Sequence, residues 1–218
     1  LTIPSNTSIT IASKYILDKD SAHINAAILD GTSNNFSDIK ITASSNFSMI
    51  GITVKKVKGK IAQMSNHDLT LKNVRLTELG HNSSNILSNS IVAKKVTIDS
   101  SAIFKNQFIE GIVTISDSLI FTNSKFYANQ GGLISNSTSG GNSTVLINKS
   151  LFIDNTRTQG NSSFGNYMTI NAQRYAVSQS KFINNSYTVF GGSGAGYSRF
   201  INNLFLNNTK NIERNPQV

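Results

Sequence analysis

The chain has no cysteine, few acidic residues and no long apolar run. Without cysteine it has neither a disulfide framework nor a thiolate metal site. Glu occurs only at positions 78, 110 and 213, and no window places apolar residues at i, i+3, i+4 and i+7 over three turns, which predicts little helix. The chain begins with Leu1 and shows neither a signal-like run nor a stretch of about 18 apolar residues, which indicates a processed form.

What the chain does contain is polar, weakly charged sequence with short β-branched runs. Charged residues make up 14% of the 218 positions and hydrophobic residues 38%, while Ser, Thr and Asn are abundant. This composition is typical of an all-β fold with many polar turns. No shift in composition marks a domain boundary, so we expect one domain over residues 1–218.

A repeat dominates the second half of the chain. A Phe is followed three residues later by an Asn in five places, and in four of them the steps from one Phe to the next are 26, 30 and 23 residues. The four pairs are Phe126 and Asn129, Phe152 and Asn155, Phe182 and Asn185, and Phe205 and Asn208. Phe200 and Asn203 fit the motif too, but they lie too close to Phe205 for both to hold the repeat position. Such spacing predicts a single-stranded right-handed parallel β-helix.

The residue types give that prediction a physical basis. A unit of about two dozen residues cannot bury its own apolar face, so it stacks on its neighbours with strands roughly 4.8 Å apart. Each Phe then lies inside the stack above the Phe of the next coil. The Asn side chains are expected to hydrogen-bond to one another along a ladder at a turn.

The rest of the chain follows the same plan with other residues. Residues 1–38 are expected to open and cap the helix, with Tyr15–Asn25 as a short capping helix or a loop. Residues 39–208 form the stacked coils, with aliphatic inward positions until Phe104 or Phe126, and residues 209–218 form a tail. The Gly- and Ser-rich stretches 135–143 and 156–166 are expected to project as loops.

The charge of the chain is concentrated in its middle. Between Lys40 and Lys105 there are ten Lys and Arg against three acids, a net charge of +7 out of the total of +9. Six lysines form the candidate patch for an anionic ligand: Lys55, Lys56, Lys58, Lys60, Lys94 and Lys95. Lys56, Lys58 and Lys60 alternate, so an extended strand would project them from one face. The patch suits an anionic glycan, and a solvated face that keeps the stack soluble is the other interpretation.

Two stretches resemble known proteins. Ala26–Gly31, followed by Ile39–Ile41 and Ser48–Val54, resembles the opening coils of right-handed β-helices of the pectin-lyase-like superfamily. Phe126–Ile134 resembles the paired Phe-x-x-Asn and Gly-Gly repeats of chlamydial polymorphic outer-membrane proteins and archaeal adhesin-like proteins. The resemblance implies a surface-displayed adhesin, such as the passenger segment of an autotransporter.

Function remains open between two classes. The favoured hypothesis is a non-enzymatic protein, secreted or at the cell surface and associated with an outer membrane, that binds a host receptor or an anionic glycan without a cofactor, a metal or nucleic acid. The alternative is a polysaccharide lyase or hydrolase on the same scaffold. No Asn-Thr-Asp, Asp-Asp or Gly-His-Gly motif of such hydrolases occurs, which favours the first hypothesis.

Overall fold

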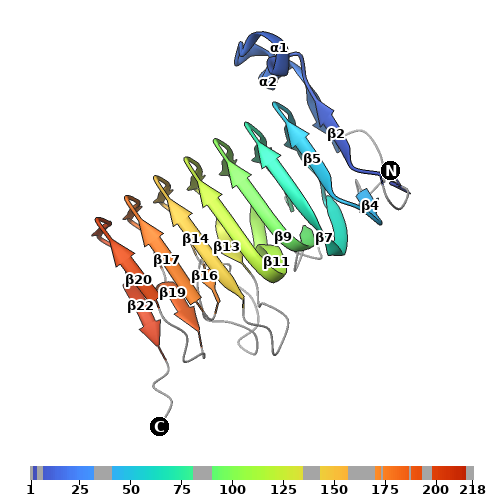
Figure 1. Ribbon diagram of the computed structural model, residues 1–218. Helices are drawn as coiled ribbons and strands as arrows, with labels where there is room; N and C mark the ends of the chain where they lie inside the picture. The colour runs from blue at the N-terminus through green and yellow to red at the C-terminus, as the bar shows by residue number, and fades with distance from the viewer. Residues whose placement is uncertain are drawn as a thin grey trace.

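A computed structural model shows the chain as a right-handed parallel β-solenoid with almost no helix (Figure 1). The structure describes residues 2–3, 7–31, 41–80, 90–134, 143–156, 170–172, 174–186, 188–192 and 198–214. Every pair of neighbouring strands runs parallel within these residues, and each coil stacks on the one before it. The fold class predicted from the sequence is confirmed.

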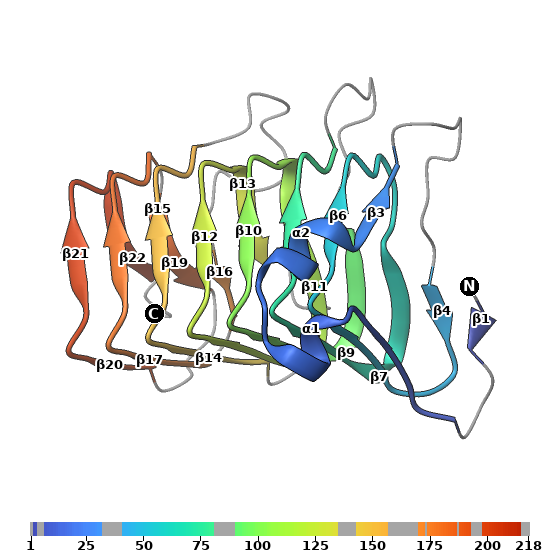
Figure 2. The ribbon, with the colours of Figure 1, turned by 90° about the horizontal axis from the view of Figure 1, so that it is seen from above.

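One side of the solenoid is an eight-stranded sheet of three-residue strands, here called the short-strand sheet (Figure 2). Each coil contributes one strand to it, in chain order along the stack. Its strands are β3 (Ile28–Asp30), β6 (Thr53–Lys55), β8 (Arg75–Thr77), β10 (Ala102–Phe104), β12 (Lys125–Tyr127), β15 (Leu151–Ile153), β18 (Lys181–Ile183) and β21 (Leu204–Leu206).

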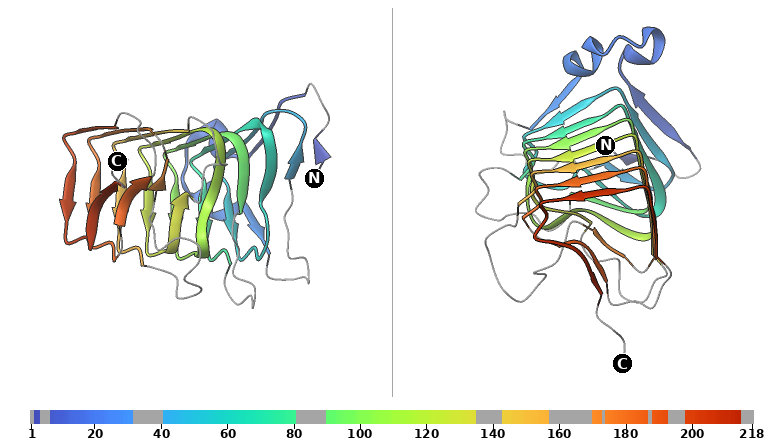
Figure 3. Two further views of the ribbon diagram at one scale, coloured as in Figure 1. Left: turned by 90° about the horizontal axis from the view of Figure 1, so that it is seen from below. Right: turned by 90° about the vertical axis from the view of Figure 1, so that its left-hand side faces the viewer.

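The other sides are formed by an eleven-stranded sheet, here called the long-strand sheet, and by a three-stranded sheet (Figure 3). The long-strand sheet contains β1 (Thr2–Ile3), β2 (Ile9–Ala12), β4 (Ile41–Ala43), β5 (Phe47–Ile50), β7 (Ala62–Lys72), β9 (Ile91–Asp99), β11 (Gln107–Thr122), β13 (Gln130–Ile134), β14 (Thr144–Asn148), β17 (Arg174–Ser178) and β20 (Ser198–Ile201). The three-stranded sheet contains β16 (Ile170–Asn171), β19 (Thr188–Gly192) and β22 (Lys210–Arg214). Strands β7, β9 and β11 shift register partway, where each turns a corner of the solenoid.

The repeated phenylalanines lie in one column inside the stack. Phe126 pairs with Phe152, Phe152 with Phe182 and Phe182 with Phe205 in the parallel register. Successive ring centroids are 5.8, 4.9 and 4.9 Å apart, and the first three side chains are fully buried. Phe200 does not belong to this column, because it lies in β20 opposite Val177.

The same column continues toward the N-terminus with aliphatic residues. Ile103 precedes Phe126, and Leu76, Val54 and Leu29 follow one another in the register before it. The aromatic filling therefore starts at Phe126. Phe104 points outward instead, where its ring stacks on Tyr127 at a centroid distance of 4.9 Å.

A ladder of asparagines closes the turns after the last five short strands, from β10 to β21. Asn155 donates from its side-chain nitrogen to the side-chain oxygen of Asn185 at 2.8 Å and to the carbonyl of Phe126 at 3.0 Å. Its own side-chain oxygen accepts from the backbone N–H and the side chain of Asn129. One buried amide thus ties three successive coils together, with both of its donors and its acceptor in use. The ladder runs through Asn106, Asn129, Asn155, Asn185 and Asn208.

A second ladder, which was not predicted from the sequence, lies in the turns before the same five short strands. Its members are Ser101, Ser124, Ser150, Ser180 and Asn203, and each side-chain oxygen accepts the backbone N–H of the preceding member. From β6 to β21, a residue with positive φ flanks every short strand on both sides, and these tight turns bring the ladder residues into line. Asn203, the partner of Phe200 in the motif, belongs to this ladder.

The N-terminal coil differs from the others in its turn. Two short helices, α1 (Tyr15–Asp18) and α2 (Ala22–Ala26), connect β2 to β3 at the place where every later coil has a tight turn (Figure 1). Ile24 is the buried residue of this segment, and its carbonyl accepts a hydrogen bond from Thr53. The predicted region Tyr15–Asn25 is therefore helical in part.

Two predicted boundaries need correction. Coils were expected from residue 39, but β1 pairs with β4, and β2 and β3 pair with β5 and β6, so stacking begins at Thr2. Residues 209–218 were expected to form a tail, yet 210–214 are the strand β22, which pairs with β19. Most of the two predicted loops, at 135–142 and 157–169, lies outside the described residues.

Candidate functional site

A polar pocket lies where β7 bends around a corner of the solenoid. Thr42 pairs with Gln63, and Phe47 pairs with Leu69. The chain therefore turns this corner in five steps in the coil of β4, from Thr42 to Phe47, and in six steps in the coil of β7, from Gln63 to Leu69. The following coil spans it in four, from Val92 to Val96. The bend of β7 therefore bulges beyond both of its neighbours. A pocket of about 360 Å³ lies beside this bulge.

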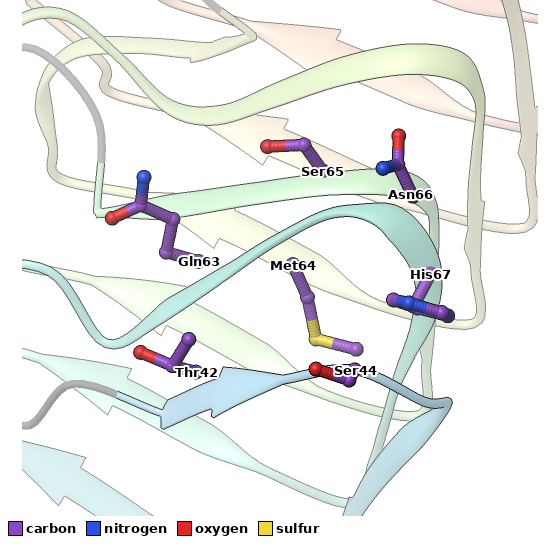
Figure 4. A pocket seen from close by; sticks show the side chains of 7 residues that line it. All are labelled: Thr42, Ser44, Gln63, Met64, Ser65, Asn66 and His67. Carbon is purple, nitrogen blue, oxygen red and sulfur yellow. The ribbon is translucent and has the colours of Figure 1, made fainter. Parts of the chain in front are cut away.

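Six polar side chains and one methionine line the pocket (Figure 4). They come from the coil of β4 and the coil of β7: Thr42, Ser44, Gln63, Met64, Ser65, Asn66 and His67. Met64 is the buried member, with 2% of its surface exposed. The other six are exposed or half-buried at the rim.

The polar side chains of the pocket do not hold the described part of the fold together. None of the six forms a side-chain hydrogen bond to another residue that the structure describes. The ladder residues differ from them, because their amides and hydroxyls form hydrogen bonds within the stack. Three hydroxyls, two amides and an imidazole that converge on one space offer both donors and acceptors to a ligand.

The chemistry of the lining selects a class of ligand. Hydroxyl and amide groups pair with the hydroxyl groups of a sugar. No carboxylate or lysine is among the seven lining residues. The pocket thus suits a neutral, polyhydroxylated unit.

Lys94 and Lys95, two of the predicted basic residues, lie close to this pocket. They occupy the tight bend of β9, which is the next strand to β7 in the sheet. Lys95 is opposite Asp68 in the register, one residue beyond His67. The two lysines therefore add positive charge one strand away from the rim.

The other four predicted lysines lie at a different corner. Lys55 ends β6 and forms an ion pair with Asp30 at 3.1 Å, and Lys56 is the left-handed residue of the following turn. Lys58 is exposed and Lys60 half-buried in a segment that is not a strand, although Val57, Gly59 and Ile61 between them are buried. Exposed lysines and buried residues therefore alternate here, although the segment is not the predicted strand. The six lysines do not form one continuous patch.

Among the described residues, Asp99, Asp117 and Asp154 lie at three separate places on the solenoid. Asp99 lies at the corner before the short-strand sheet, Asp154 at the corner after it, and Asp117 in the bend of β11. Burial raises the pKa of Asp99, but hydrogen bonds from Asn123, Thr122 and Ser100 outweigh it and leave the pKa lowered. A general acid needs the opposite shift.

In the helical segment, the carboxylate of Asp18 lies beside His23. The backbone N–H of Asp20 lowers the pKa of Asp18, and His23 at 3.0 Å acts in the same direction. Within the described part of the chain, no three His, Cys, Asp or Glu side chains lie together as metal ligands would. His81 lies outside the described residues.

Comparison of the chain with protein-family models, curated proteins and solved structures found no match. Among the helices that the structure describes, none is long and apolar enough to cross a membrane.

Proposed function

We propose that the chain is a non-enzymatic β-helix protein that binds a glycan at the pocket beside β7. The supporting observation is the convergence of six polar side chains without hydrogen-bond partners among the described residues, in a molecule whose ladder polar groups are spent on the fold. Exposed polar side chains that form no hydrogen bond within the protein can exchange their bonds with water for bonds with a ligand. Groups left free around one hollow are available to a ligand.

The charge near the pocket favours an anionic glycan. Lys94 and Lys95 lie one strand from the rim, where a carboxylate or sulfate on a neighbouring sugar would reach them. The stiff stack beneath holds both groups in a fixed relation, because each coil is hydrogen-bonded to the next on every side. A preorganised site loses less entropy on binding.

The role of such a protein follows from the sequence resemblance. A pectin-lyase-like β-helix with Phe-x-x-Asn repeats fits a secreted or surface-displayed adhesin, similar to an autotransporter passenger, that presents its outer surface to a host cell. This placement, in the extracellular space or at an outer membrane, is part of the proposal.

A glycan-binding screen with a matched pair of variants tests the site. Replacing Gln63 and Asn66 by Ala removes two side-chain amides, each worth about 1 kcal/mol in a hydrogen bond, so affinity should fall roughly thirtyfold. Ser116→Ala, in the corresponding bend of β11, is the control and should bind as the unaltered protein does. Equal affinity of all three proteins for every bound glycan would refute the assignment.

The same glycans test the absence of turnover. Incubation with acidic and neutral polysaccharides should release no reducing ends and no unsaturated products. Product formation that Asp117→Asn or Asp99→Asn abolishes would replace the adhesin proposal with a polysaccharide-degrading enzyme.

A further inference from the structure

The outer face of the short-strand sheet changes character along its length. In a three-residue strand the first and third side chains point outward and the middle one points into the core. In the first coils, the third position holds Asp30, Lys55 and Thr77, of which the first two form an ion pair. From β10 onward it is apolar: Phe104, Tyr127, Ile153, Ile183 and Leu206.

These five residues form one continuous apolar row, here called the apolar strip. They are in register from strand to strand, and Leu151 and Leu204 extend the strip at the first position of their strands. Leu204 and Leu206 are 45% and 46% exposed, while Phe104, Tyr127, Ile153 and Ile183 are half-buried. An outer sheet face in water normally alternates toward polar residues, so a contiguous apolar row indicates a surface that contacts something else.

Three exposed lysines border the apolar strip on one side. Lys125 and Lys181 are the first residues of β12 and β18, with Leu151 between them in the register. Lys149 lies in the turn that leads to Leu151, with a positive φ of 49°. The three come from consecutive coils, and none of them forms an ion pair with a described residue. Asp99, on the same corner, is held by Ser100, Thr122 and Asn123.

We infer that this face docks on an anionic lipid bilayer. Aliphatic and aromatic side chains beside a row of free lysines are the combination that binds a bilayer surface, because the apolar groups enter the interface while the lysines contact anionic headgroups. Lysine stems also lie along apolar surface and extend their ammonium groups outward. The sheet supplies the flat arrangement, since all seven apolar side chains belong to one set of parallel strands (Figure 2).

Two other occupants fit the face less well. A second copy of the chain would have to pair its three lysines with acids on this face, and the only acid at the outward positions of the short strands, Asp30, is paired with Lys55. The strip is also small, about 7 Å from first to third residue and about 19 Å over five strands. Stable protein interfaces use about 800 Å² per partner. A bilayer needs no such complementary area.

Sedimentation with lipid vesicles tests the inference. The protein should bind vesicles that contain phosphatidylglycerol and not vesicles of phosphatidylcholine alone. The triple variant K125Q/K149Q/K181Q should bind about a hundredfold more weakly, at roughly fivefold for each lysine. The control K56Q/K58Q/K94Q removes the same charge from other corners and should lose far less.

A second variant separates the apolar contribution from the charge. I153T/I183T keeps the β-branched shape of both side chains and should weaken vesicle binding several-fold even at high salt. Leu146→Thr, an exposed leucine of β14, is its control and should have no effect. Unchanged circular dichroism and melting temperature would show that all variants fold.

Three results would overturn the inference. One is equal binding of the two lysine triple variants, and another is the absence of binding to anionic vesicles. The third is saturable binding to soluble polyglutamate without vesicle binding, lost in K125Q/K149Q/K181Q, which would assign the face to an acidic polypeptide. Because the pocket is separate, Q63A/N66A should leave vesicle binding unchanged.

Discussion

The two turns that flank β15 hold the same coil in place by different means. Ser150 stands before the strand and Asn155 after it, and both are buried. Asn155 reaches the coils on both sides with separate donors, whereas the single hydroxyl hydrogen of Ser150 faces two carbonyls, Asn148 at 2.8 Å and Phe121 at 3.3 Å. The asparagine turn therefore stabilises the stack more than the serine turn does.

The last coil offers a natural test of that difference. Asn203 takes the position of serine there, accepts the N–H of Ser180 at 2.9 Å, and donates to the carbonyl of Val177 at 2.9 Å. Serines in the same ladder reach the equivalent carbonyls only at 3.3 and 3.4 Å. An amide is long enough to bridge coils where a hydroxyl is short.

Removing a rung of the asparagine ladder should have the largest effect. Asn155→Ala removes four side-chain hydrogen bonds and leaves the buried N–H of Asn129 without its acceptor, at about 1 kcal/mol for each bond lost. We expect the free energy of unfolding to fall by about 4 kcal/mol in urea denaturation. The control is Asn184→Gly. Asn184 is exposed, has a positive φ and occupies the same turn position as Asp154 of the preceding coil, so this substitution should change the free energy of unfolding little. Similar losses in both variants would contradict the ladder.

The serine rung of the same coil should matter less. Ser150→Ala leaves the N–H of Ser124 without its acceptor at 3.3 Å, a long hydrogen bond. The expected loss is about 1–2 kcal/mol in the same measurement. A loss as large as that of Asn155→Ala would show that the two turns are equivalent.

Exchanging the residue types sharpens the comparison. Ser150→Asn should lie within about 0.5 kcal/mol of the unaltered protein, because Asn203 already occupies this position in the last coil. Asn155→Ser should cost about 2 kcal/mol, since a hydroxyl cannot reach Phe126 and Asn185 together. Thermal melts should show a lower melting temperature for Asn155→Ser than for Ser150→Asn. Equal melting temperatures would contradict the difference between the two turns.

The smallest effect concerns the charge beside the serine turn. The pKa of Asp99 is lower in the folded protein than its ordinary value of 3.8, so its ionised form adds stability above about pH 4 and that contribution disappears as the pH falls through the folded pKa. Asp99→Asn should cost less than about 1 kcal/mol at pH 7, because the group is partly exposed. The difference between the two proteins should shrink below pH 4 in denaturation at several pH values.

The sequence predicted the repeat and the asparagine ladder, but not the serine ladder that also holds the coils together. Phe and Asn recur at fixed offsets, and both are uncommon enough together to reveal Phe126, Phe152, Phe182 and Phe205 as one column. Ser is so frequent in this chain that the second ladder left no visible pattern. The signal existed, because each ladder Ser or Asn stands two residues before the inward residue of its short strand.

The candidate site was harder to predict than the fold. The pocket depends on how many residues each coil uses at one corner, which is a difference between neighbours and not a motif. The lysines were visible, but their distribution over two corners required the register. The apolar strip was hidden for the same reason, since its five residues in register are 23 to 30 positions apart.

Hydrogen exchange of side-chain amides tests the central claim, that the coils are locked in register by buried asparagines. The side-chain N–H groups of Asn129, Asn155 and Asn185 should exchange in NMR as slowly as the backbone of the neighbouring strands, because both donors are buried and bonded. The exposed Asn66 should exchange orders of magnitude faster. Fast exchange of all four would contradict the register on which both proposed binding surfaces depend.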